Sequence, residues 1–401
     1  MKKTPKLRFK EFRGDWESKK LEELGEFFKG STLSKANLSK EGKPCILYGE
    51  LYTRYGEVIK DVISKTDLDE NKLVIGNKND VLIPSSGESA IDIATASCLQ
   101  QDNVILGGDL NVFRSDKLNG IFTSYQLNSS KRHEIAKLAQ GASVVHVYNN
   151  QLSKLKLNVP LKEEQEKIGS FISLIDDKIY LQRDKVEALK DYKSGMIQKI
   201  FSRELRFKND DGKDYPEWEE GKVKDIIIEH LYPIDKPADS YWRLGLRSHG
   251  KGTFHEFVTD PSKVSMDKLY VVKKNMLIVN ITFAWEHAIA ITDALDEGKL
   301  VSHRFPTYDF NENALYDFYK YYILLPKFKY CLLNASPGGA GRNRVLNKKQ
   351  FLEIDVPIPC IEEQNKISKI LSHLDIKINK EQEKLDSLNE YKKGLLQQMF
   401  V

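Results

Sequence analysis

The feature that most constrains this chain is an internal repeat. Displacing the sequence by 199 residues aligns 151–201 with 350–400 without a gap, and 18 of the 51 aligned pairs are identical. Unrelated segments of this length would share only a few residues. The match therefore predicts two copies of one structural unit rather than a set of unrelated domains.

The repeat also extends upstream, with looser spacing. The segment Leu7-Arg8-Phe9-Lys10 recurs as Leu205-Arg206-Phe207-Lys208, and each copy is followed by a tryptophan, Trp16 or Trp218. The chain thus alternates between a variable part and a shared part. We expect four regions: a variable domain over 1–150, a shared segment over 151–204, a second variable domain over 205–347 and a second shared segment over 348–401.

The shared segment has the pattern of a long helix with a coiled-coil seam. Pro160 followed by Glu163 and Glu164 is typical of a helix start, where acidic side chains complement the helix dipole. From 163 to 201 such a helix would be about 58 Å long. Alternating steps of four and three residues select positions that are apolar in eight of ten cases in each copy. These positions are Ile168, Ile172, Ile175, Ile179, Gln182, Val186, Leu189, Lys193, Met196 and Ile200, and then Ile367, Leu371, Leu374, Ile378, Glu381, Leu385, Leu388, Lys392, Leu395 and Met399.

Two matching seams in one chain can pack against each other. A whole variable domain separates them in the sequence, which favours an antiparallel pair, and Gln182 and Glu381 would then lie close together at its centre. A polar residue in a seam costs stability but fixes the register. The alternative is two separate amphipathic helices, each packed on its own domain.

Both variable domains are predicted to be mixed α/β. In the first we expect strands at 43–48, 72–75, 80–84 and 109–114 and a helix at 129–140. In the second, 241–246 matches 46–51, 274–280 matches 79–85 and 303–307 matches 111–114. The aromatic-rich stretch 313–333 is predicted to be helical, with its rings in the core. The expected fold class is α+β: two mixed α/β domains and two long helices in an antiparallel coiled coil, related by a pseudo-twofold repeat.

Composition sets limits on partners. The chain has 62 basic and 58 acidic residues, so only local patches could bind nucleic acid. The first ten residues are basic but lack the apolar stretch of a signal peptide, and no run of about 18 apolar residues is present. The four cysteines have no metal-ligand spacing, which favours buried thiols in the cytoplasm.

The strongest candidate for DNA contact is the glycine-rich cluster 338–344, in which Arg342, Asn343 and Arg344 stand together. Arginine can bind guanine bidentately and asparagine can bind adenine, while glycines allow close approach of the backbone. The matching place in the first half, 141–143 followed by His146, has no arginine. The alternative interpretation is a flexible basic surface loop.

A second cluster lies on another glycine-rich loop of the second half and comprises Arg243, Arg247, His249 and Lys251. Its first-half counterpart is Tyr52, Arg54 and Tyr55 after Gly49. A solvated loop is the alternative for both. Weaker candidates follow corresponding strands: Ser85 with Ser86 and Gly87, and the segment 282–287 with Trp285.

No catalytic constellation is recognisable. The sequence has no P-loop, no dinucleotide-binding glycine motif after a strand, no Asn/Asp-Pro-Pro-Tyr/Phe tetrapeptide of amino-methyltransferases and no paired histidines at metal spacing. The pairs Glu163-Glu164 and Glu362-Glu363 are expected to complement helix dipoles. Two alternatives to a DNA-reading subunit stay open: a nuclease or methyltransferase with a site not visible in the sequence, and a coiled-coil scaffold that binds no DNA.

The repeated Pro…Glu-Glu-Gln-x-Lys-Ile block, at 160–168 and 359–367, resembles the conserved regions of type I restriction-modification specificity (S) subunits. The leading Leu-Arg-Phe segments, the downstream tryptophans and the Gly-Arg-Asn-Arg loop before the second block are similar too. The resemblance covers essentially the whole chain, in the order recognition domain, conserved helix, recognition domain, conserved helix.

The resemblance implies a function. Each target recognition domain would bind one half of a split, asymmetric site on double-stranded DNA, and the coiled coil would set the spacer. The chain would join two methyltransferase (M) subunits and two motor-nuclease (R) subunits in the cytoplasm. It would have no catalytic residue, metal or cofactor of its own, since S-adenosylmethionine, ATP and Mg would bind to the partners. Because residues 141–146 include no arginine, the DNA-contact role expected of Arg342, Asn343 and Arg344 is not assigned to the first half.

Overall fold

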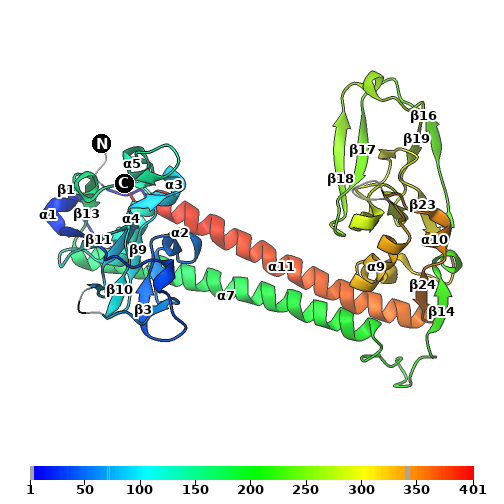
Figure 1. Ribbon diagram of the computed structural model, residues 1–401, viewed down its shortest axis with the longest axis horizontal. Helices are drawn as coiled ribbons and strands as arrows, with labels where there is room; N and C mark the ends of the chain where they lie inside the picture. The colour runs from blue at the N-terminus through cyan, green and yellow to red at the C-terminus, as the bar shows by residue number, and fades with distance from the viewer. Residues whose placement is uncertain (1–3, 70, 72, 339–343) are drawn as a thin grey trace. The chain divides into compact units, whose positions relative to one another are not determined.

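The computed structural model describes residues 4–69, 71, 73–338 and 344–401 (Figure 1). The chain forms two compact units. Unit 1 comprises Met1–Val186 with Glu381–Val401, and unit 2 comprises Glu187–Lys380. Each unit therefore contains part of both long helices, α7 (Lys162–Phe201) and α11 (Ile361–Met399). No helix in the described part of the chain is both long and apolar enough to cross a membrane.

Unit 1 is built on two larger sheets and two strand pairs. The short helices α1 (Leu21–Leu24), α2 (Glu50–Thr53), α3 (Ala90–Ile93), α4 (Gly120–Asn128), α5 (Arg132–Leu138) and α6 (Asn149–Leu152) connect the strands. The five-stranded sheet has the order β2 (Glu26–Lys29), β11 (Leu110–Arg114), β7 (Val81–Pro84), β9 (Ser97–Leu99), β4 (Val58–Ile59). The four-stranded sheet has the order β5 (Lys65–Thr66), β3 (Lys43–Ile46), β10 (Val104–Leu106), β6 (Val74–Gly76). The pairs are β1 (Glu17–Lys20) with β13 (Lys156–Val159), and β8 (Ser86–Gly87) with β12 (Val145–His146).

Unit 2 repeats this plan with one strand fewer in one sheet and one more in the other. One sheet has the order β15 (Ile227–Glu229), β23 (Thr307–Phe310), β20 (Leu277–Val279), β21 (Ile289–Ile291). The other has the order β16 (Pro233–Asp235), β19 (Lys268–Val271), β22 (Leu300–Val301), β17 (Tyr241–Leu246), β18 (Thr253–Val258). The pair β14 (Glu219–Lys222) with β24 (Asp355–Ile358) corresponds to β1 with β13. A parallel pairing recurs at the matching place of each unit, β3 with β10 and β17 with β22, and unit 1 has a further one, β4 with β9.

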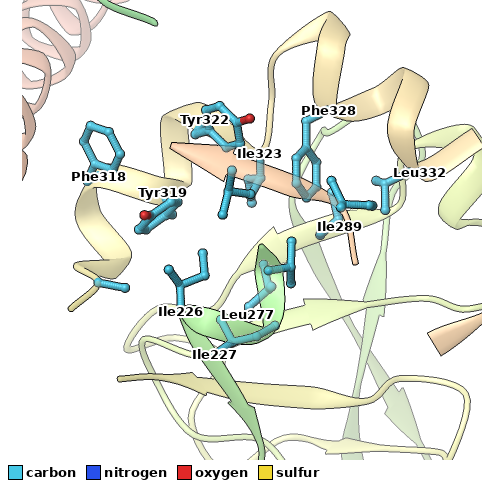
Figure 2. Packing of buried hydrophobic residues seen from close by; sticks show 14 of the residues in the cluster. Ile226, Ile227, Leu277, Ile289, Phe318, Tyr319, Tyr322, Ile323, Phe328 and Leu332 are labelled. Atoms are coloured by element: carbon cyan, nitrogen blue, oxygen red, sulfur yellow. The ribbon is translucent and has the colours of Figure 1, made fainter. Parts of the chain in front are cut away.

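The aromatic-rich stretch of unit 2 supplies its largest core, as expected from packing. Phe318, Tyr319 and Tyr322 on α8 (Tyr316–Tyr322) and Phe328 on α9 (Pro326–Asn334) belong to one buried cluster that also contains strand residues such as Ile227 and Leu277 (Figure 2). The predicted single helix over 313–333 is in fact two, because Pro326 begins α9 and holds the preceding residue in extended conformation. The last helix before α11 is α10 (Lys348–Leu352).

Three other predicted elements differ from the structure. The stretch 46–51 is not a strand like β17, since β3 ends at Ile46 and α2 begins at Glu50. The predicted helix at 129–140 is shorter, as α5, and is preceded by α4, whose weak amphipathic pattern reflects burial on nearly every side. Of the expected strand at 303–307, only the last residue belongs to β23.

The long helices run antiparallel. In unit 1, Gln182 Nε2 donates to the Glu381 carboxylate at 2.8 Å and to its carbonyl at 2.9 Å, so the expected proximity of these seam residues is found. Hydrogen bonds from Gln182, Lys185 and Lys384 lower the pKa of Glu381 to about 2. Each seam position is buried or half-buried: Ile168, Ile172, Ile175, Ile179 and Leu189 on α7, and Ile367, Leu371, Leu374, Ile378 and Leu388 on α11.

A polar contact repeats in the two units. In unit 1 Lys392 lies 2.7 Å from Asp176, which also accepts a hydrogen bond from Tyr125 at 2.6 Å. In unit 2 the residues displaced by 199 positions, Lys193 and Asp375, form the same ion pair, and Tyr321 donates to Asp375 at 2.6 Å. The pseudo-twofold repeat thus extends to individual side chains.

The repeated acidic pairs serve more than the helix dipole. Glu163 is exposed, but Glu164 is fully buried and accepts two hydrogen bonds of 2.7 Å from Arg8. In unit 2, Arg206 donates to Glu363 in the same way, at 3.2 and 2.9 Å. These bidentate pairs fasten the leading segments, 7–10 and 205–208, to the helix starts, which corrects the interpretation from dipole complementation alone.

Candidate nucleic-acid interface

In unit 2 the turn between β17 and β18 is held by the short segment 282–287. His249, Gly250 and Gly252 of this turn have positive φ. The backbone N–H groups of His249 and Gly250 donate to the carbonyls of Glu286 and His287 at 2.7 and 2.9 Å. The hydroxyl of Ser248 donates to the Glu286 carboxylate at 2.6 Å. The turn that presents Arg247, His249 and Lys251 is therefore fixed rather than loosely solvated.

The same segment supports Arg344. The Arg344 guanidinium lies 5.9 Å from the centroid of the Trp285 ring, within cation–π range. An isolated bridge pairs Gly338 with Arg344, and the Leu346 N–H donates to the Ile281 carbonyl at 2.8 Å. Arg342 and Asn343, the other two predicted readers, lie outside the described residues. Two predicted clusters are thus brought together around 282–287, which contains η5 (Ala284–Glu286).

The cations of unit 2 differ in how far they are neutralised. Arg243 on β17 forms an ion pair of 2.6 Å with Glu256 on the neighbouring strand β18. Arg247 instead lies over the Phe254 ring at 5.3 Å. Within the described ranges, no ion pair joins Arg247, Lys251 or Arg344 to a carboxylate. These three side chains can meet a phosphate or a base without first losing a salt bridge.

Sequence reasoning missed Arg304. The residue lies in the turn between β22 and β23, and its Nη1 donates to the Thr282 hydroxyl at 3.0 Å. The interpretation of 303–307 as a strand concealed this exposed arginine. Its place in the sequence, separated from the apolar Leu300-Val301 by Ser302 and His303 and two residues before Pro306, was the available signal for a turn.

The corresponding place in unit 1 has different chemistry. The bridge between Gln140 and His146 closes a loop as Gly338 and Arg344 do in unit 2. His146 Nδ1 lies 2.9 Å from the Ser86 hydroxyl, and its ring stacks with Tyr148 at 6.3 Å. Lys29 lies 5.5 Å from the Tyr148 ring centroid. Ser85, predicted as a contact, is instead buried, with its hydroxyl lacking a partner within the described part of the chain.

The remaining candidates of unit 1 lie on α2 and at its end. Tyr52 is half-buried, and burial raises the pKa of its phenol, which therefore stays neutral. Arg54 is exposed and pairs with the buried carboxylate of Glu50 at 3.2 Å. Arg54 is therefore partly neutralised, unlike Arg247 and Arg344.

The described residues contain no group of three or more metal-ligating side chains. All four cysteines are free thiols, and burial raises the pKa of Cys45 to about 11 and of Cys98 to about 12. These two thiols are therefore protonated and weakly reactive.

The chain thus consists of two mixed α/β units of like topology, each of which includes part of both long helices, and unit 2 presents cationic side chains on its loops. This is the arrangement expected of a duplicated DNA-binding subunit. The sequence profile described as "Type I restriction modification DNA specificity domain" matches twice, over residues 13–191 and 216–390. The chain belongs to this family, whose members are non-catalytic subunits that carry no cofactor, because S-adenosylmethionine and ATP bind to other subunits of the complex.

Relatives agree in length and fold. The type I restriction enzyme MjaVIII specificity subunit of Methanocaldococcus jannaschii is 23% identical over 430 residues, which cover 97% of this chain and 94% of the relative. The crystal structure of the S subunit of a type I restriction-modification system from M. genitalium superposes with a TM-score of 0.61 at 17% identity, covering 99% of each chain. A chain from a structure of type I restriction-modification complex assembly superposes with a TM-score of 0.55 at 12% identity, covering 95% of this chain and 96% of that chain. At these identities the two structures show a shared fold.

Proposed function

We propose that each unit reads one half of a bipartite, asymmetric site on double-stranded DNA. The observation that carries this proposal is the contrast between the matching loops. Unit 2 presents Arg344 and the fixed turn with Arg247, whereas unit 1 presents His146 and Tyr148. Like scaffolds with unlike side chains suit two different half-sites. The proposal assigns 1–150 and 205–347 as recognition domains and 151–204 and 348–401 as conserved regions.

The helix pair would set the spacer between the half-sites. In its support, α7 is continuous over 40 residues and α11 over 39, and polar contacts in the seam specify one register. A continuous helix with a fixed register would hold the elements at its two ends at a set separation, since each residue adds about 1.5 Å.

The exposed faces of the two helices would dock the methyltransferase subunits. Tyr192 and Tyr391 occupy equivalent positions of the repeat and are 57% and 54% exposed. Large exposed aromatic side chains at equivalent positions suit two copies of one partner. We infer an assembly with two M subunits and two R subunits in the cytoplasm, in which S-adenosylmethionine, ATP and Mg bind to the partners.

A reconstitution tests this function. The full chain is assembled with its methyltransferase partner, and the methylated adenines of a genomic library are sequenced. We expect two short specified blocks separated by an unspecified gap of constant length. The variant Arg344→Ala should weaken or relax recognition at one block and leave the other unchanged. Methylation without sequence preference, or an equal fall at both blocks, would contradict the assignment of one unit to each half-site.

A further inference from the structure

Unit 2 contains a cleft of about 380 Å³ between the β17–β18 ribbon and the segments that follow β20 and β22. Its mouth carries Phe254, Phe283 and Arg304, which are all exposed. Phe254 can lie flat on the ribbon only because Gly245 faces it, since a Cβ there would be 2.3 Å from the ring. The floor consists of buried apolar side chains: Leu244, Leu269, Leu300 and Val301.

Two arginines line this cleft, and they differ in whether a carboxylate neutralises them. Arg243 is held by Glu256 at 2.6 Å. Arg304 is tied to the Thr282 hydroxyl through one nitrogen, and no carboxylate among the described residues forms an ion pair with it. Its backbone is fixed as well, because its carbonyl accepts the Ile281 N–H at 3.0 Å. Arg304 is therefore a positioned cation whose other N–H groups are free to donate.

Shape and chemistry together select the occupant. Base edges lie recessed in the DNA grooves and are read by protruding protein elements, whereas the sugar-phosphate backbone forms a ridge. A concave site with an apolar floor and a cation at its mouth matches that ridge, with deoxyribose against the phenylalanines and phosphate against arginine.

Building on the proposed function, we propose that this cleft receives the sugar-phosphate backbone of one DNA strand. Arg304 donates to a phosphate at the mouth. Glu256 lowers the affinity of the cleft for DNA, because it neutralises Arg243 and places a negative charge beside the phosphate. The cleft therefore positions unit 2 on DNA, and other side chains read the bases.

The first test is Arg304→Ala in the full chain assembled with its methyltransferase partner. Binding to a fluorescent duplex is measured at several salt concentrations. One duplex contains the target sequence found by methylation sequencing, and the other has that sequence scrambled. We expect affinity to fall about three- to tenfold at ~0.1 M salt for both duplexes, and the slope of log K against log salt to become shallower by about 0.9, the loss of one phosphate contact. Arg304→Lys should retain the slope.

The second test has the opposite sign. Glu256→Gln should tighten binding to both duplexes and steepen the salt slope by about 0.9, because Arg243 becomes available to a phosphate. Glu353→Gln is the matched control, since Glu353 pairs with Lys222 and Lys224 and does not line the cleft. It should leave both quantities unchanged. Thermal melts by circular dichroism verify that each variant is folded.

The outcomes separate the two proposals. Unchanged salt slopes in Arg304→Ala and Glu256→Gln, with intact sequence preference in the wild type, would overturn the cleft and leave the proposed function standing. Relaxed preference at one base pair with an unchanged slope would make Arg304 a base reader and also overturn it. A wild-type complex without sequence preference would contradict the proposed function, while the scrambled duplex still tests the backbone contact.

Discussion

At the scale of single residues, the two repeated tryptophans have the same place but different partners. Trp218 Nε1 donates to the buried Glu363 carboxylate at 2.8 Å, alongside Arg206. Trp16 is equally buried, yet its Nε1 has no partner within the described residues. Both indole rings pack into the core of their unit. The two tryptophans therefore differ mainly in one hydrogen bond, which Trp218 donates to a charged carboxylate.

We predict that Trp218→Phe destabilises unit 2 more than Trp16→Phe destabilises unit 1, by about 1–2 kcal/mol, because both changes lose packing and only the first removes a hydrogen bond. Urea unfolding is monitored by hydrogen exchange in each unit separately, because the two units need not unfold together. The difference between the two variants is read from the unfolding free energy of the unit that carries each change. Equal losses would mean that the indole N–H of Trp218 contributes nothing to stability.

At the scale of elements, the repeated Tyr-Asp-Lys contacts join the long helices to the recognition domains. The unit 1 copy has an additional carboxylate: Lys392 also lies 3.0 Å from Glu57. Although burial lowers the pKa of Lys392, the carboxylates Glu57 and Asp176 raise it overall. Burial raises the pKa of Asp176, while Lys392 opposes that shift. Removing the lysine would leave two carboxylates without compensation.

Lys392→Met should therefore lower the free energy of unfolding by roughly 3 kcal/mol at pH 7. Lys193→Met should lower it by less, because only one carboxylate loses its partner. The sign of the pH dependence follows from the raised pKa of Asp176. A carboxyl group whose folded-state pKa exceeds its unfolded value destabilises the fold above that pKa and ceases to do so as pH falls. The cost of Lys392→Met should shrink between pH 7 and pH 5 in urea titrations. A cost that is independent of pH would indicate lost packing instead.

Elements also differ in how far the sequence could predict them. The long helices were predictable to within a residue or two, because a seam and a repeat impose the same boundaries twice. The antiparallel direction and the Gln182–Glu381 contact followed from the same two facts. The strands of two or three residues were not predictable, since pairs such as β8 with β12 depend on partners about 60 residues away.

The candidate site was predictable only in part, for a related reason. Residue type and glycine content indicated Arg247 and Arg344, but their shared support on 282–287 depends on tertiary hydrogen bonds. Arg304 was missed because a turn was interpreted as a strand. Ser85 was misplaced because its neighbour Ser86 carries the contact to His146.

At the scale of the whole molecule, the internal duplication separates the features that repeat from the features that differ. The features that repeat are structural: the Arg8–Glu164 and Arg206–Glu363 pairs, the sheet orders and the seam. The features that differ lie on the loops of the recognition domains. Under the proposed function, divergent loops on this repeated scaffold would let one architecture read two unlike sequences.

The most direct test of this account changes the helices alone. One heptad is inserted after Gln182, and a second is inserted before Glu381 so that the antiparallel register is kept. Sequencing of methylated adenines should then return both half-sites unchanged, with a spacer longer by up to about three base pairs, since seven residues add ~10.5 Å and each base pair spans about 3.4 Å. The same spacer as in the wild type, with both half-sites still methylated, would contradict the claim that the helix pair sets the separation of two DNA readers.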